Sequence, residues 1–287
     1  MTAIRRLLSE LIDYAGLFPP AALSMNLAVT SYASYRASPD AWALARFVVP
    51  AGRLDELAAE AAVHVDGEPW RLSVLAQAGD AAMLGAFNAR HRGRLLVDTV
   101  ETRASSTDEL AALAPLAEVA TMFVEVPVRD DPDALIAAIG AHGWRAKIRT
   151  GGVSPDAFPS SHDVARFLAA CARHDMMFKA TAGLHHPLRG EYPLTYAPGA
   201  ARHGMFGFLN VFLAAAYARR GRPEDEVAHL LEERNPAAIT QTADGVTWRG
   251  LTLDEAALAE NRRRFALSFG SCSFREPLDD LSALGLT

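Results

Sequence analysis

The sequence predicts an α/β fold, a single (β/α)8 barrel (TIM barrel) with an insertion between its seventh and eighth strands. Short apolar segments alternate with helical patterns along the whole 287-residue chain. The spacing between successive strands is about 20 to 32 residues up to the seventh, which is typical of parallel βαβ units. Eight such strands are the number that closes a barrel. A doubly wound open sheet is the alternative, but no G-x-G-x-x-G motif follows the first strand.

The eight strand candidates are apolar runs that end in polar or glycine-containing segments. In chain order, they cover residues 12–18, 45–51, 70–77, 94–101, 121–128, 145–151, 177–183 and 265–271. The sequence thus predicts one continuous series of strands, with residues 1–287 as one domain.

Helical candidates lie between these strands, with apolar residues at helical spacing. They cover residues 31–45, 53–64, 81–91, 106–117, 131–143, 161–175 and 206–221, with a short last helix at 276–285. Residues 184–264 are the predicted insertion, which begins with a loop rich in Pro, Gly and Tyr. Further helices, including 224–234, and a hairpin over 238–253 follow it.

Composition narrows the class of function. The formal net charge is −6 and no segment is dense in Lys or Arg, so we expect no nucleic-acid partner. No apolar run approaches the ~20 residues of a bilayer span, and the N-terminus lacks the apolar stretch of a signal peptide. Cys171 and Cys272 do not form a disulfide framework. We therefore expect a cytoplasmic protein with a small-molecule substrate, and the sequence leaves open whether it forms a homo-oligomer.

Strand alternation predicts which polar side chains point into the barrel. Outward positions should be apolar because they pack beneath helices. This pattern turns Glu125, Lys147, Arg149, Lys179 and Thr181 inward, toward the carboxyl ends of their strands. Barrel active sites are built at that end. The alternative is an ion-pair lattice that only stabilises the barrel interior.

Two further acidic positions are less clearly placed. Asp13 lies near the end of the first strand and also fits an inward position. In the fourth strand the inward face is ambiguous. Asp98 shares a face with Leu96 and Val100, whereas Glu101 shares the other face with Val97 and Thr99.

The two lysines are the most informative feature. Of 28 Lys and Arg residues, only Lys147 and Lys179 are lysines, and they fall on adjacent predicted strands. Unlike arginine, lysine can lose its proton near neutral pH and form a Schiff base with a carbonyl. Two neighbouring ammonium groups also lower the pKa of one of them. We expect Glu125 or Asp98 to act as the general base, while the alternative is that both lysines and Arg149 only hold an anion.

Each lysine stands in a K-x-x-x-G motif, Lys147 with Gly151 and Lys179 with Gly183. This pair resembles the deoxyribose-phosphate aldolase family of class I aldolases, which are (β/α)8 barrels. The family has a Schiff-base lysine on strand six and a second, pKa-lowering lysine on strand seven. The resemblance implies that Lys147 is the Schiff-base residue and Lys179 its neighbour.

The loops after the last strands contain further polar candidates. His185 is interpreted as a general acid or base, and His186 and His203 as residues that hold the loop and the substrate. The alternative is a metal site that combines these histidines with Glu125 or Asp98. Arg189 is a candidate anion binder, and Gly151 and Gly152 or the turn at Ser271 could bind a phosphate through backbone N–H groups, unless they are simple tight turns.

We therefore predict an aldolase-like lyase that acts on a small, anionic carbonyl compound without a cofactor. A lyase or hydrolase dependent on a divalent metal is the first alternative, and a non-catalytic anion-binding barrel is the second. The predicted catalytic residues are Lys147, Lys179, Glu125, Asp98 and His185. The predicted substrate-binding residues are Asp13, Arg149, Gly151, Gly152, Thr181, His186, Arg189, His203 and Ser271.

Overall fold

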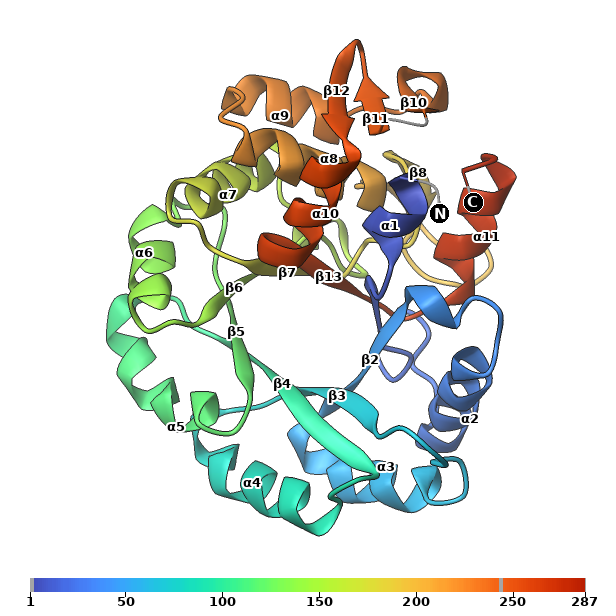
Figure 1. Cartoon of the computed structure of the whole chain (residues 1–287), viewed down its shortest axis with the longest axis vertical. Helices are drawn as coiled ribbons and strands as arrows, with labels where there is room; N and C mark the ends of the chain where they lie inside the picture. The colour runs from blue at the N-terminus through green and yellow to red at the C-terminus, as the bar shows by residue number, and fades with distance from the viewer. Residues whose placement is uncertain (1–2, 243–244, 287) are drawn as a thin grey trace.

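The computed structural model describes residues 3–242 and 245–286, and it confirms the predicted barrel (Figure 1). Eight parallel strands close on themselves, because the first strand pairs with both the second and the last. The strands are β1 (Ile12–Tyr14), β2 (Leu44–Pro50), β3 (Trp70–Leu75), β4 (Leu95–Arg103), β5 (Thr121–Glu125), β6 (Arg145–Arg149), β7 (Phe178–Thr181) and β13 (Ala266–Ser271). Each overlaps a segment that the sequence predicts as a strand.

Helices surround the barrel and cover the outward faces of its strands (Figure 1). They are α2 (Met25–Arg36), α3 (Leu54–Ala61), α4 (Ala81–Arg90), α5 (Ala114–Ala117), α6 (Asp133–Ala141), α7 (Ser161–Arg173), α8 (Phe208–Arg219) and α11 (Arg275–Ala283). The short helix α1 (Ala3–Leu8) precedes β1.

Two helices differ from their predicted bounds for local reasons. The helix predicted over 31–45 starts at Met25, because the Ser24 side chain accepts a hydrogen bond from the N–H of Leu27 and caps it. It ends at Arg36, three residues before Pro39, where a helix cannot continue. The helix predicted over 106–117 is a 3-10 helix over Thr107–Leu113, with only one α-helical turn after it.

The segment between β7 and β13 fits the predicted insertion. It contains β8 (Gly190–Pro193), β9 (Arg202–Met205), α8, α9 (Glu224–Leu231), β10 (Ile239–Thr242), β11 (Gly245–Trp248), β12 (Leu251–Asp254) and α10 (Glu255–Arg264). The predicted hairpin is a three-stranded antiparallel sheet, and residues 243 and 244 between its first two strands lie outside the described residues. The predicted loop contains a two-stranded ribbon, β8–β9.

Burial agrees with the alternation on which the site prediction depends, and the contacts that Lys147 and Lys179 make with Glu101 of β4 show that both lysines face the interior. Met122 and Val124 of β5 and Ala146 and Ile148 of β6 are almost inaccessible, as outward residues beneath helices should be. Their neighbours on the same strands therefore face the barrel interior. Among the described residues, no helix is both long and apolar enough to cross a membrane.

Candidate active site

Three charged residues lie at one level of the barrel. In the strand register, Glu125 is the partner of Lys147, and Lys147 is the partner of Lys179. The two lysine side chains are almost completely buried, with exposed fractions of 4% and 1%. Burial of this kind requires compensating charges, and the neighbouring strands provide them.

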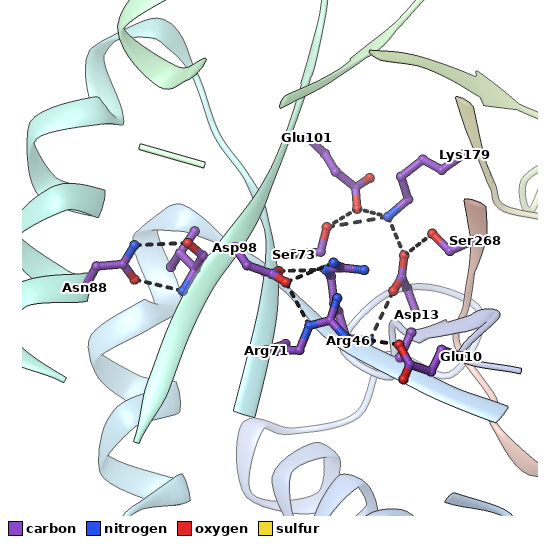
Figure 2. A network of polar contacts seen from close by, with 12 residues as sticks. Glu10, Asp13, Arg46, Arg71, Ser73, Asn88, Asp98, Glu101, Lys179 and Ser268 are labelled. Atoms are coloured by element: carbon purple, nitrogen blue, oxygen red, sulfur yellow. Dashed lines mark hydrogen bonds and ion pairs between the residues drawn. The ribbon is translucent and has the colours of Figure 1, made fainter. Parts of the chain in front are cut away.

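Glu101 of β4 bridges the two lysines. Its Oε2 lies 2.8 Å from Nζ of Lys147, and its Oε1 accepts a hydrogen bond of 2.5 Å from Nζ of Lys179. Ser73 of β3 also donates a hydrogen bond to Oε1, at 2.6 Å, which is the third polar contact of this carboxylate (Figure 2). One buried carboxylate thus holds both amines in place.

Asp13 of β1 encloses Lys179 from the other side. Its Oδ2 lies 2.6 Å from Nζ of Lys179 and accepts a hydrogen bond of 2.7 Å from Ser268 (Figure 2). Its Oδ1 accepts from the backbone N–H of Arg46, at 3.1 Å. Asp13 therefore lies in the predicted cluster, where it pairs with a lysine.

Lys147 has a second carboxylate of its own. Glu125 Oε2 lies 2.9 Å from Nζ of Lys147, and Glu125 Oε1 accepts from Nε of Arg149 at 3.0 Å. The charges therefore alternate along one chain: Arg149, Glu125, Lys147, Glu101, Lys179, Asp13. Three cations meet three anions, so the cluster is neutral as a whole.

This alternation changes the expected protonation of Lys147. Burial acts to lower the pKa of Lys147, but attraction to Glu101 and Glu125 outweighs it and raises the pKa above its ordinary value. For Lys147, the expected lowering by the second ammonium group is therefore wrong. Burial of Glu101 acts to raise its pKa, yet the two lysines dominate and hold it far below its usual range. Both groups are charged at neutral pH.

A cavity of about 340 Å³ opens above this cluster, at the carboxyl ends of the strands. Glu101 and Lys147 lie at its floor, and Arg149, Thr181 and His185 line its sides. Lys147 lines the cavity and Lys179 does not. The two lysines thus differ in access: a ligand in this cavity meets the amine of Lys147, while that of Lys179 lies deeper.

Asp98 is not part of this cluster. A β-bulge places it as an extra residue in β4, because Leu72 pairs with Val97 and Ser73 pairs with Thr99. Its carboxylate binds Arg46 at 2.6 Å and Arg71 at 2.8 Å (Figure 2). The position beside the lysines belongs to Glu101, and the ambiguity of the sequence pattern reflects the bulge.

The histidines occupy different positions around the cavity. His185 Nδ1 lies 3.2 Å from Glu276 Oε2 and 3.9 Å from the Sγ of Cys272. Burial acts to lower the pKa of His185, but its contacts with Cys272 and Glu276 prevail and raise it to about 9. Both contacts engage Nδ1, so Nε2 is the ring atom available to a ligand.

His186 and His203 have structural contacts. His186 binds Asp280 at 2.6 Å and stacks on Tyr192 with ring centroids 3.5 Å apart. His203 lies on β9 against the ring of Phe158. The structure thus does not bring the three histidines together with Glu125 or Asp98. Among the residues that the structure describes, no group of three or more His, Cys, Asp or Glu is arranged to hold a metal.

The remaining predicted binding residues divide into two sets. Thr181 and Gly152 line the cavity. Arg189 instead stabilises the insertion: it binds Glu232 at 3.2 Å and lies over the ring of Phe206. Ser271 is buried, and its backbone carbonyl accepts a hydrogen bond from Ala15.

Gly151 allows the close packing of two loops beside the cavity. A Cβ at this position would lie 2.5 Å from the ring of Phe158 and 3.0 Å from the Cα of Gly183. The glycines of the two K-x-x-x-G motifs thus meet and allow the loops after β6 and β7 to approach closely. This contact gives a physical reason for the repeated spacing.

Comparisons of the chain with protein-family models, with curated proteins and with solved structures found no match. The aldolase resemblance therefore rests on the two lysine motifs and on the order of the barrel strands.

Proposed function

We propose that this protein is a lyase that forms an iminium between Lys147 and a small, anionic carbonyl compound. The observation that carries the proposal is the position of Lys147 at the cavity floor, bridged through Glu101 to the deeper Lys179. In this proposal the amine of Lys147 provides the covalent chemistry, and the reaction uses no added cofactor.

The resting ammonium must lose its proton before it can attack. The 2.9 Å contact between Lys147 and Glu125 provides a direct path for that proton. A substrate that excludes water from the cavity makes the charged pair of Lys147 and Glu125 less stable, because charges are less stable in a dry site. Transfer of the proton to Glu125, which leaves a neutral amine and a neutral acid, then becomes more favourable. The substrate anion also competes with Glu125 for Arg149.

The free amine then adds to the carbonyl carbon, and the carbonyl oxygen takes up a proton from Glu125 to give a carbinolamine. The nitrogen, which is positively charged after the addition, returns a proton to Glu125. Glu125 passes this proton to the hydroxyl group, which leaves as water and gives the iminium. Glu125, again a carboxylate, removes the proton of a hydroxyl group on the β-carbon of the substrate. The Cα–Cβ bond then breaks, that oxygen becomes the carbonyl of the first product, and the electron pair of the bond moves toward the iminium nitrogen to give an enamine. Protonation of the enamine and hydrolysis release the second product and return Lys147.

Lys179 is a positioning residue in this scheme. It holds Glu101 at 2.5 Å, and Asp13 in turn holds Lys179 at 2.6 Å. Glu101 therefore remains negative and fixed beside Lys147, where it stabilises the positive charge of the iminium.

His185 and Arg149 complete the proposed site. His185 lines the cavity and is oriented by Glu276, so its Nε2 can exchange a proton with the substrate oxygen. Arg149 is about half exposed, with an exposed fraction of 48%, and it lines the same cavity. We assign to it the anionic group of the substrate.

Borohydride trapping tests the proposal. The chain has only two lysines, so a reduced adduct can form only at Lys147, Lys179 or the N-terminal amine. We expect small keto acids or aldehydes, with pyruvate and glyoxylate as first probes, to give a stable mass increase in the wild-type protein. The increase should vanish in Lys147→Arg, which keeps the charge. An adduct that persists in Lys147→Arg and Lys147→Met would contradict the proposal.

Anion binding without catalysis is the second candidate. The raised pKa of Lys147 and the half-exposed Arg149 favour it, because both provide fixed positive charge at the cavity. This candidate predicts that Lys147→Arg binds the same keto acids with unchanged affinity and that the wild-type protein gives no adduct. Calorimetry of the two proteins, combined with the trapping experiment, separates the candidates.

A further inference from the structure

The opposite opening of the barrel, at the amino ends of the strands, has a cavity of its own. Its volume is about 480 Å³, which lies in the range of small-molecule sites. We call it the N-terminal mouth. Its lining includes Arg46 on β2, Phe123 on β5, Arg145 at the start of β6, and Arg262 and Arg263 at the end of α10, with Glu10 as the only acidic residue among the lining residues described.

The charge of this mouth is not balanced within the described part of the chain. Arg46 is matched by Asp98, and Arg6, which also lines the mouth, is matched by Glu255. Glu10 is shared with Arg71. Arg145, Arg262 and Arg263 have no carboxylate partner among residues 3–242 and 245–286, although the whole chain carries a net charge of −6.

Arg145 is the central unpaired cation. Its guanidinium is partly buried and packs on the ring of Phe123, 5.6 Å from the ring centroid. Burial and the neighbouring charge of Arg46 lower its pKa. An arginine remains protonated despite such a shift. A bound anion would therefore offset both the cost of burying the charge of Arg145 and its repulsion by Arg46.

Arg262 is fixed in place by the backbone. Its Nη2 donates to the carbonyl of Ser9 at 2.9 Å, and its Nη1 donates to the carbonyls of Ala266 and Leu267. Its Nε is buried and makes no hydrogen bond to the described residues. Burial lowers its pKa to about 10, which leaves it charged at neutral pH. Asp13 and Glu10 attract this cation and oppose the effect of burial on its pKa, and the neutral carbonyls orient it without cancelling its charge.

We infer that the N-terminal mouth is a binding site for a small polyanion, whose charge is carried by phosphate or by several carboxylates. Planar guanidinium groups bind both types of anion in two-point geometry. Arg145 and Arg263 provide the open donors, Arg262 adds a rigid charge, and Phe123 and Met177 cover the apolar part of the ligand. The inference is independent of the lyase proposal, because it concerns the other end of the barrel.

The mouth is connected to the lysine cluster. Ser268 lines the mouth and donates to Asp13, and the backbone N–H of Arg46 donates to the same carboxylate (Figure 2). Asp13 in turn holds Lys179. An anion in the mouth therefore lies next to the groups that position the amines.

Titration calorimetry at constant ionic strength tests the site, with pyrophosphate and citrate as probes. We expect saturable binding of one equivalent of at least one probe, and the tighter probe identifies phosphate or carboxylate as the preferred group. Arg145→Gln should weaken binding about tenfold or more, since each charge-assisted hydrogen bond contributes strongly. Arg263→Gln, at an exposed position, should weaken it in the same direction without affecting the fold.

Two matched variants locate the binding. Arg90→Gln removes an exposed arginine that pairs with Asp55 and lines neither cavity, and it should leave affinity unchanged. Arg149→Gln removes the cation of the proposed active site and should also leave it unchanged. The inference is overturned if neither probe binds saturably, or if Arg149→Gln or Arg90→Gln weakens binding as much as Arg145→Gln does.

Discussion

At the residue scale, Glu101 determines the properties of the proposed site. It touches both lysines, and its removal would leave two buried ammonium groups that share only Asp13 and Glu125. In the proposed mechanism Lys147 reacts only after it loses a proton, so the carboxylate that stabilises the fold would also keep the amine protonated until a substrate binds. Stability and reactivity at Lys147 are therefore coupled through one residue.

We expect Glu101→Gln to destabilise the protein by about 3 kcal/mol at neutral pH, because it leaves buried charge uncompensated. The pKa of Lys147 in the folded variant should fall below its ordinary value, because burial lowers it and the attraction of Glu101 is lost, so the unfolded state binds more protons than the folded state. The stability difference between this variant and the wild type should then shrink as pH rises toward the ordinary lysine pKa, while the decline caused by His185 is common to both proteins. Urea denaturation at pH 7 and pH 9.5 measures both effects, with the exposed Glu224→Gln as control. Equal stability of Glu101→Gln and the wild type would contradict the assigned role.

His185 provides a second prediction at this scale. Its pKa is raised to about 9 from the ordinary histidine value of 6.5, so the folded state keeps a proton that the unfolded state releases. The resulting stabilisation is fully present below pH 6.5 and is lost as pH rises through 9, and it amounts to at most about 3 kcal/mol. Unfolding free energies between pH 6 and 10 should show this decline in the wild type. A decline of the same size in His185→Gln would show that another group causes it.

At the element scale, the loops after β6 and β7 are held together by the contact between Gly151 and Gly183. The Cβ of an alanine at position 151 would lie 2.5 Å from the Phe158 ring and 3.0 Å from the Gly183 backbone. These loops lie at the carboxyl ends of the two lysine strands, so their approach fixes one wall of the cavity.

Gly151→Ala should therefore destabilise the fold by about 1–3 kcal/mol, as overpacking does, and should reduce adduct formation. Gly85 is the matched control: it lies exposed within α4, and a Cβ there would meet nothing within 4 Å. Gly85→Ala should stabilise the protein by about 0.5–1 kcal/mol through helix propensity. Thermal and urea denaturation of both variants test the pair, and unchanged stability of Gly151→Ala would show that the loops can separate without penalty.

The element scale also shows where sequence reasoning succeeds and where it fails. Alternation placed Lys147, Lys179 and Glu125 correctly, because outward positions in a barrel must be apolar. The alternation pattern could not decide whether Asp98 or Glu101 points inward. A β-bulge in β4 shifts the two-residue alternation, and no residue in the local sequence reveals the bulge. Arg189 and His186 lie in loops, whose side-chain directions follow from tertiary packing rather than from any periodicity. The partners Ser73, Ser268 and Glu276 are distant in sequence, and the pattern gave no signal for them.

At the scale of the whole molecule, the barrel brings together residues from seven strands that are up to 255 positions apart, as in the hydrogen bond between Ser268 and Asp13. The protonation of Lys147 depends on distances to carboxylates on other strands, which is why two adjacent lysines suggested a lowered pKa and the folded chain shows a raised one. The same interior connects two cavities, one at each end of the barrel.

The central claim is that the amine of Lys147, rather than that of Lys179, reaches the substrate. It is tested most directly by tryptic peptide mapping of the wild-type protein after borohydride trapping with a bound keto acid. Trypsin does not cleave at a modified lysine, so we expect the peptide 146–149 to appear uncut and to carry the added mass. The account would be contradicted if the added mass lay in the peptide that contains Lys179, while the chain was cleaved after an unmodified Lys147.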